Sequence, residues 1–159
     1  MFSTRPYRMG RCAPLGYMPA EMVRRAGEKE GDLLMHTILI VDDQLDFAQP
    51  MAFWFKSKGF SVTVASNLGE VLKGLQESVP DLIFLDIIMP GVDGPAMLKK
   101  IREVSATVSV IMMSSYIEDK RDDKRVNYYQ VSGIFFKGDD FSQALAMAEP
   151  LLKKSSSPS

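Results

Sequence analysis

The sequence predicts an α/β protein with a doubly wound, five-stranded parallel sheet. Five short apolar runs alternate with amphipathic segments between residues 37 and 152. The runs are rich in β-branched and aliphatic residues, which is typical of strands that are covered on both faces. Parallel strands need crossover connections, so helices are expected on both faces of the sheet. Within these 159 residues we find no internal repeat and no second core.

The composition excludes several classes of protein. The formal net charge is -1, so no global basic field favours tight, non-specific binding to nucleic acid. No uninterrupted apolar run approaches the roughly 18 to 20 residues that span a bilayer, and Pro14, Gly16, Pro19 and Glu21 interrupt any apolar region of a signal peptide. Cys12 is the only cysteine, which precludes an intramolecular disulfide and agrees with a reducing compartment. We therefore expect a cytoplasmic protein that binds neither nucleic acid nor membrane.

The N-terminal part of the chain lacks the patterns of a folded segment. Residues 1–34 mix Arg, Pro, Gly and charged residues without a sustained period, so they are expected to form a disordered extension. Met35 directly precedes the first strand, and one hypothesis is that the natural polypeptide begins there. The functional alternative is a basic docking arm with Arg24 and Arg25. The folded domain is expected to span residues 35–153.

The first strand and the first helix have clear patterns. Residues 37–41 are a continuous aliphatic run that stops at Asp42. A helix is expected over residues 45–57, since apolar residues recur at helical spacing and Gly59 provides a stop signal. Pro50 lacks a backbone donor, so we expect it to delay or kink the first turns. The apolar side of this helix consists of Leu45, Ala48, Met51, Ala52 and Phe55.

The second unit begins with a weakly alternating segment, residues 61–65, which predicts a strand. Asn67 and Glu70 then have the spacing of a capping box, which predicts the start of a helix. Pro80 ends this unit, and the third strand is expected over residues 81–86.

The third helix is predicted by turn chemistry. Asp93 and Gly94 form a turn signal, and Pro95 suits the first position of a helix. The apolar positions of this helix are Met97, Ile101 and Val104.

The last third of the domain contains two more strands. Residues 108–113 predict the fourth strand, which ends at the hydroxyls of Ser114 and Ser115. Residues 116–130 carry dense charge and a thin apolar face, and we interpret them as a helix. Residues 133–136 predict a short fifth strand.

The chain is expected to end with an amphipathic helix and a short tail. Asp140 can cap this helix, whose apolar positions continue to Leu152. The serine-rich residues 154–159 are expected to be disordered.

Polar side chains gather where the strands end. In a doubly wound sheet the functional crevice lies beyond the carboxyl ends of the strands. Clustered carboxylates repel one another and raise each other's pKa unless a cation lies among them, and oxygen ligands suit Mg²⁺. A carboxylate can also attack a phosphoryl group, provided that charge on the phosphoryl oxygens is neutralised. The residues at these strand ends are Asp42, Asp43, Asp86, Ser114 and Lys137.

Four motifs in this order resemble the receiver domain of two-component response regulators, over about residues 36 to 153. The resemblance implies a flavodoxin-like strand order of 2-1-3-4-5. The motifs are residues 38–43 (Ile-Leu-Ile-Val-Asp-Asp), 85–94 (Leu-Asp-Ile-Ile-Met-Pro-Gly-Val-Asp-Gly), 113–115 (Met-Ser-Ser) and 136–137 (Phe-Lys).

The resemblance also implies roles for single residues. It implies that Asp86 accepts a phosphoryl group and that Asp42 and Asp43 hold Mg²⁺, with Asp43 favoured as the direct ligand. Ile88 lies two residues after Asp86 and would lend its backbone carbonyl to the metal.

Two further residues and two partners follow from the same resemblance. Ser114 would donate a hydrogen bond to the phosphoryl group, and Lys137 would pair with it. The phosphoryl donor would be a histidine kinase or a phosphotransfer protein. The downstream target is a protein that the sequence does not identify.

Two positions depart from the family pattern. Gly138 follows Lys137, where the family usually has a proline. Ile134 stands three residues before the lysine, where the family usually has an aromatic switch residue, and Phe135 is on the opposite face of the strand. Other aromatic residues that could report the phosphorylated state are Tyr116, Tyr128 and Tyr129.

The sequence leaves several functions to be weighed. The first is a stand-alone receiver: a phosphorylation-controlled signalling protein that is not an enzyme and acts through protein contacts. The second is a receiver-like adaptor that works without phosphorylation, as the departures at Gly138 and Ile134 suggest. A phosphatase with an aspartyl nucleophile is third, because Ile88 stands where such enzymes carry a second acid. An oxidoreductase is weaker still, since no G-x-G-x-x-G follows the first strand.

Overall fold

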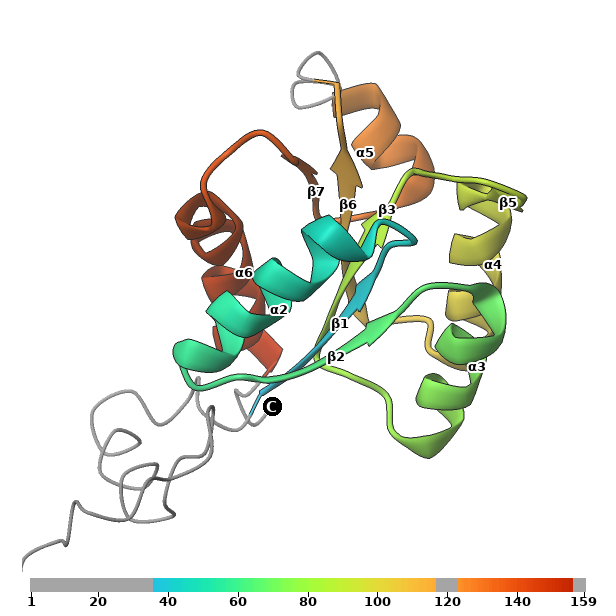
Figure 1. Ribbon diagram of the computed structural model, residues 1–159. Helices are drawn as coiled ribbons and strands as arrows, with labels where there is room; N and C mark the ends of the chain where they lie inside the picture. The colour runs from blue at the N-terminus through green and yellow to red at the C-terminus, as the bar shows by residue number, and fades with distance from the viewer. Residues whose placement is uncertain (1–35, 117–122, 156–159) are drawn as a thin grey trace, which may run out of the picture.

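The computed structural model describes residues 36–116 and 123–155, and its centre is a five-stranded parallel sheet (Figure 1). The strands lie in the order β2-β1-β3-β6-β7. Counted along the chain, the five parallel strands therefore have the order 2-1-3-4-5, which confirms the flavodoxin-like prediction. Their bounds are β1 (Thr37–Val41), β2 (Ser61–Ala65), β3 (Leu82–Asp86), β6 (Ser109–Ser114) and β7 (Gly133–Phe136).

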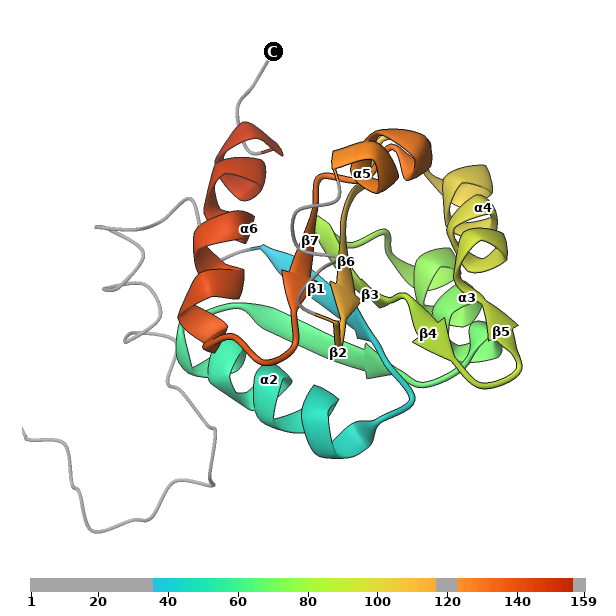
Figure 2. The ribbon, with the colours of Figure 1, turned by 90° about the horizontal axis from the view of Figure 1, so that it is seen from above.

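Helices cover both faces of the sheet, as the sequence predicts. Figure 2 shows α2 and α6 on one face and α3, α4 and α5 on the other. Each face has its own apolar core, one built around Phe55, Phe84 and Phe135 and the other around Leu85, Met97 and Ile101. The helices are α2 (Leu45–Ser57), α3 (Leu68–Glu77), α4 (Gly94–Val104), α5 (Asp123–Tyr129) and α6 (Phe141–Ser155).

The register of the parallel strands aligns their carboxyl ends. Val41 pairs with Leu85, Asp86 pairs with Met113, and Ser114 pairs with Phe136. Residues that end neighbouring strands, or directly follow them, therefore lie along one edge of the sheet. This edge carries the candidate site.

Helix α2 has the predicted bounds but differs in two details. Leu45 is 44% exposed at the first position of the helix, so its expected place on the apolar side was wrong. The helix includes Pro50 and is regular from Leu45, so the expected delay was also wrong. The proline lies on the exposed side, away from the core. The other apolar positions of the prediction are buried as expected: Ala48, Met51, Ala52 and Phe55.

The start of α3 confirms the capping prediction. Asn67 Oδ1 accepts a hydrogen bond from the Glu70 backbone N at 2.9 Å. The Glu70 carboxylate reaches back one residue further than expected and accepts from the Ser66 backbone N at 2.7 Å. This hydrogen bond and one from the Ser66 hydroxyl lower the pKa of Glu70 below its usual value.

A small hairpin between β3 and α4 was not predicted. It consists of β4 (Ile88–Met89) and β5 (Val92–Asp93), which pair in antiparallel fashion. Gly91 occupies its turn with a φ of 72°, a conformation that favours glycine. Gly94 then begins α4 so close to β3 that a Cβ there would lie 2.7 Å from the Ile87 carbonyl oxygen.

The remaining elements differ from expectation by small shifts. Strands β3 and β6 each begin one residue later than predicted, and Ser114 is the last residue of β6 rather than the first residue of a loop. Val104 ends α4 at 43% exposure and is not a core position. Of the helix expected over residues 116–130, the structure describes Asp123–Tyr129 as α5. Residues 117–122 lie outside the described part of the chain, as do residues 1–35 and 156–159. Among the described helices, none is long and apolar enough to cross a bilayer.

Candidate functional site

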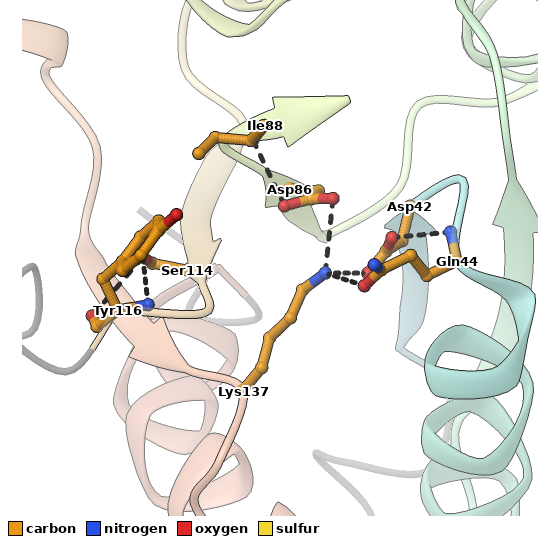
Figure 3. Close-up of polar contacts among 7 residues, drawn as sticks. All are labelled: Asp42, Gln44, Asp86, Ile88, Ser114, Tyr116 and Lys137. Atoms are coloured by element: carbon orange, nitrogen blue, oxygen red, sulfur yellow. Dashed lines mark hydrogen bonds and ion pairs between the residues drawn. The ribbon is translucent and has the colours of Figure 1, made fainter. Parts of the chain in front are cut away.

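Asp86 lies at the centre of the carboxyl edge, as the last residue of the fully buried strand β3. Its side chain is 4% exposed, and Oδ1 accepts a hydrogen bond from the Ile88 backbone N at 3.3 Å (Figure 3). The four preceding residues of the strand, Leu-Ile-Phe-Leu, pack into the cores on both faces of the sheet. This packing fixes the position of the Asp86 backbone. A charged group is therefore held at the rim of an apolar sheet.

Asp42 and Asp43 follow β1, the neighbouring strand. Asp42 is fully buried, and its Oδ1 accepts a hydrogen bond from the Gln44 backbone N at 2.9 Å. Each of Asp42, Asp43 and Asp86 offers one carboxylate oxygen, and these three oxygens lie within 4.8 Å of one another. The structure thus brings together the three carboxylates that the sequence predicts to lie at this edge.

Lys137 extends from the end of β7 into the same cluster (Figure 3). Its Nζ lies 2.7 Å from Asp42 Oδ2 and 3.2 Å from Asp86 Oδ2, and its side chain is only 8% exposed. Its backbone N donates to the Ser114 carbonyl at 2.7 Å, which ties the strand end to β6. One ammonium group therefore faces the buried carboxylates of two other strands.

The environment of Asp86 raises its pKa from 3.8 to about 6. The largest cause is burial, which penalises the charged form, and the neighbouring Asp42 carboxylate adds to it. The Lys137 ammonium and the Ile88 backbone N act in the opposite direction. The charged form of Asp86 is thus disfavoured by its surroundings, and added positive charge would stabilise it.

The cluster suits Mg²⁺ for two reasons: its donors are carboxylate oxygens, and one of these oxygens has no hydrogen-bond donor among the described residues. Asp42 Oδ2 is buried and accepts no directed hydrogen bond from the described residues, although its charge is paired with Lys137. This oxygen already faces one cationic group, and a metal ion would suit it as well. Carboxylate oxygens, together with waters that a small cleft admits, are the ligands that Mg²⁺ prefers. Of the three carboxylates, Asp43 is the most exposed and thus the most open to a hydrated ion.

A small cleft of about 130 Å³ opens beside Asp86. Ser114 is 2% exposed, and its Oγ accepts a hydrogen bond from the Tyr116 backbone N at 3.0 Å. Figure 3 shows Ser114 and Tyr116 on the side of Asp86 opposite to Asp42. The side chains of Ile88 and Tyr116 form an exposed apolar rim, at 61% and 59% exposure. The cleft is lined by Gln44, Asp86, Ile88, Ser114, Ser115, Tyr116 and Lys137.

The structure also describes the two positions that depart from the family pattern. The described peptide bonds, that of Lys137 and Gly138 included, are all trans. A Cβ at Gly138 would collide with the ring of Phe136, so the ring occupies the space that a side chain would need. Ile134 is buried in the core with α4, and Phe135 is buried in the core with α2, on opposite faces of β7 as expected.

Two further residues contact Lys137 and were not among the predicted site residues. Gln44 Oε1 accepts a hydrogen bond from Lys137 Nζ at 3.1 Å, and the Phe47 ring lies 5.0 Å from the same Nζ. Gln44 directly follows the acidic pair, which is a signal that could have identified it. Phe47 has the helical spacing of an ordinary core residue, so its contact with a lysine 90 positions away has no local signal.

Comparisons with known proteins agree with this geometry. The family model described as the response regulator receiver domain matches residues 38–149. Sensory transduction protein RegX3 of Mycolicibacterium smegmatis is 33% identical over 107 residues, which are 67% of this chain and 43% of that protein. The DNA-binding transcriptional regulator NtrC of Escherichia coli is 31% identical over 114 residues, which are 70% of this chain and 24% of that protein. The chain thus spans less than half the length of either relative.

Solved structures resemble the fold over most of the chain. A two-component response regulator from Clostridium difficile has a TM-score of 0.68 and 28% identity, covering 77% of this chain and 99% of that one. The response regulator TrrA from Thermotoga maritima, solved in complex with Mg(2+)-BeF, has a TM-score of 0.63 and 25% identity, covering 74% and 99%.

Proposed function

This chain belongs to the response regulator receiver family of two-component signalling, and from that premise we propose that Asp86 accepts a phosphoryl group that controls its signalling. The observation that carries the proposal is the buried Asp86 carboxylate with Lys137 Nζ at 3.2 Å and two more carboxylates beside it. A carboxylate that served the fold alone would be satisfied by hydrogen bonds. This one is held at the rim of a cleft at a strand end.

The proposed reaction transfers a phosphoryl group from a phosphohistidine. The P–N bond to the donor imidazole breaks while an Asp86 oxygen forms a new P–O bond, which gives an acyl phosphate and leaves the donor histidine without its phosphoryl group. Asp86 must be unprotonated to attack. The donor is a histidine kinase or a phosphotransfer protein, which would approach over the exposed side chains of Ile88 and Tyr116 at the rim of the cleft.

Lys137 and Ser114 would act on the oxygens of the transferred group. The Lys137 ammonium already lies beside Asp86 Oδ2 and would pair with the added negative charge. Ser114 lines the same cleft on the other side of Asp86 and would donate its hydroxyl to another phosphoryl oxygen. Charge that develops in the transition state would then be met from two sides.

Asp42 and Asp43 would hold Mg²⁺ together with Asp86 and the backbone carbonyl of Ile88. When bound, this ion would neutralise charge on the carboxylates and on the phosphoryl oxygens. Asp42 suits this role because it is buried, its Oδ1 is oriented by the Gln44 backbone N, and its Oδ2 already faces a cationic group, Lys137 Nζ at 2.7 Å.

The proposal includes signalling by this domain, residues 35–153, as a unit of its own through contacts with a downstream protein. Both faces of the sheet are covered, and each has a closed core, which supports independent folding. Tyr128 is 80% exposed on α5 and belongs to the surface that a partner could contact.

The test is phosphorylation with a small donor. Acetyl phosphate or beryllofluoride with Mg²⁺ should shift the NMR signals of residues around Asp86, and Asp86→Asn should abolish the response. Asp46→Asn is the matched control, because Asp46 is an exposed carboxylate in the first turn of α2. An unmutated protein that does not respond to either reagent would overturn the proposal.

A phosphorylation-independent adaptor is the second candidate. Ile134 is buried where the family usually has an aromatic switch residue, and this observation favours it. The two candidates differ in one measurement, the affinity for a captured partner. Affinity that survives Asp86→Asn and does not respond to beryllofluoride favours the adaptor.

A further inference from the structure

Lys137 is held in this chain by contacts other than a following proline. The next residue is Gly138, and the Phe136 ring occupies the space that a Cβ at this position would need. Its Nζ has two kinds of partner. Asp42 and Asp86 are carboxylates of the acidic cluster, whereas Gln44 and Phe47 belong to the start of α2 and carry no charge.

The Gln44 side chain is not needed to begin the helix. Its backbone carbonyl accepts hydrogen bonds from the Phe47 and Ala48 backbone N atoms, both at 3.0 Å, and its backbone N donates to Asp42 Oδ1. The side chain makes no capping hydrogen bond. Its amide oxygen instead accepts from Lys137 Nζ at 3.1 Å, across 93 positions of sequence.

Phe47 places an aromatic face beside the same ammonium group. The distance of 5.0 Å from Nζ to the ring lies within the range of a cation–π interaction. The ring is fixed by an edge-to-face contact with Phe141 of α6, at 5.8 Å between centroids. The ammonium is thus linked through Phe47 to the two helices that cover this face of the sheet.

The two kinds of partner would behave differently during the reaction proposed above, on which this inference rests. Asp86 would become an acyl phosphate, and Asp42 would turn to a cation, so both carboxylates would change charge or partner. Gln44 and Phe47 are neutral and would keep the same contact throughout. Among the described contacts of Nζ, these two are the ones that would persist.

We propose that Gln44 and Phe47 are positioning residues that aim Lys137 at the phosphoryl group on Asp86. Gln44 supplies direction, because an amide oxygen accepts along a defined line. The Phe47 ring packs beside the ammonium group and prevents it from rotating away from Asp86. Neither residue touches the reacting atoms in this role, and both act through Lys137.

The first test is a double-mutant cycle on the rate of phosphorylation by acetyl phosphate with Mg²⁺. Gln44→Leu keeps the size of the side chain and removes the acceptor, and it should lower the rate about fivefold, the equivalent of one ordinary hydrogen bond. The same substitution should have no effect in a Lys137→Ala background. Phe47→Leu should also lower the rate of phosphorylation, by a smaller factor, and only when Lys137 is present. Gln49→Leu, at an exposed position of α2, is the control.

A second measurement does not depend on phosphorylation. The NMR signal of the Lys137 ammonium should shift and broaden in Gln44→Leu and stay in place in Gln49→Leu, which changes an exposed position of α2. An unchanged ammonium signal in Gln44→Leu overturns the proposal. So does a rate loss of the same size with and without Lys137. If the unmutated protein is not phosphorylated but the ammonium signal responds as expected, the proposed function fails while the positioning stands.

Discussion

At the amino end of the sheet, Asp81 Oδ2 accepts two hydrogen bonds from Thr37, whereas at the carboxyl end Asp86 accepts one long bond from the Ile88 backbone N. The Thr37 backbone N donates at 2.8 Å and its hydroxyl at 3.3 Å. The Asp81 backbone N in turn donates to the Thr37 carbonyl at 2.9 Å, and His36 Nδ1 lies 3.4 Å from the same carboxylate. Asp81 is 34% exposed, so water also solvates it.

The carboxyl end has the opposite balance. Asp42 and Asp86 are almost completely buried, they repel each other, and a single ammonium group is shared between them. The amino-end carboxylate joins β1 to the start of β3 and serves the fold. The carboxyl-end cluster lowers the stability of the fold and retains charge that a ligand can neutralise, which is the usual mark of a functional site.

Removing the amino-end carboxylate should give the largest change in stability. Asp81→Ala leaves the Thr37 backbone N without its partner and should lower the free energy of unfolding by about 2 kcal/mol. Urea denaturation measures this value, and Asp46→Ala, on an exposed helix position, is the control. A loss below about 0.5 kcal/mol, the usual size for a surface substitution, would mean that Asp81 does not join the two strands.

Neutralising Asp86, at the carboxyl end, should raise the free energy of unfolding rather than lower it. The pKa of Asp86 is about 6 in the fold against a usual 3.8, so between these values the folded state binds more protons than the unfolded state. Stability contributed by this group is therefore lost as pH rises from about 4 to 6. Asp86→Asn should raise the free energy of unfolding by about 1 to 2 kcal/mol at pH 7.5, after allowance for solvent around the cleft.

The pH dependence separates this effect from general repacking. The gain in Asp86→Asn should disappear near pH 4, where the wild-type carboxyl is protonated in the fold. A gain of equal size at pH 4 and pH 7.5 would contradict the electrostatic cause.

Added cation should stabilise one end of the sheet alone. Mg²⁺ at ten times its dissociation constant should raise the free energy of unfolding by about 1.4 kcal/mol, and chelation should reverse the gain. Asp42→Asn should remove the effect, because it replaces a buried carboxylate of the cluster with a neutral amide. Asp81→Ala should leave it intact. Equal Mg²⁺ effects in all three proteins would indicate non-specific binding.

The fold could be predicted from the sequence because its signals are local. The helix at residues 45–57 has clear helical spacing and the strand at residues 61–65 alternates weakly, and the bounds of both agree with the structure. The β4-β5 hairpin could not be predicted, since two-residue strands have no period to detect. The exposure of Leu45 at the first turn of α2 depends on tertiary packing, which periodicity does not give.

The candidate site divides in the same way. The carboxylates and Lys137 could be predicted to meet because they lie at the carboxyl ends of strands in one parallel sheet. Gln44 and Phe47 contact Lys137 through the packing of α2 against the loop after β7, and this depends on long-range geometry. Local pattern therefore predicts which charged groups meet at the edge of the sheet, and tertiary packing decides which further residues contact them.

Removing the shared ammonium group should give the smallest change and the most specific one. In Lys137→Met the lysine charge no longer lowers the pKa of Asp86, while burial and the Asp42 carboxylate continue to raise it. The titration midpoint of Asp86, followed by carbon NMR of the side-chain carboxyl in the presence of a chelator, should move above about 6. A midpoint for Asp86 that stays in place would mean that Lys137 does not offset the repulsion between the carboxylates, and the cluster would then depend on an added cation alone.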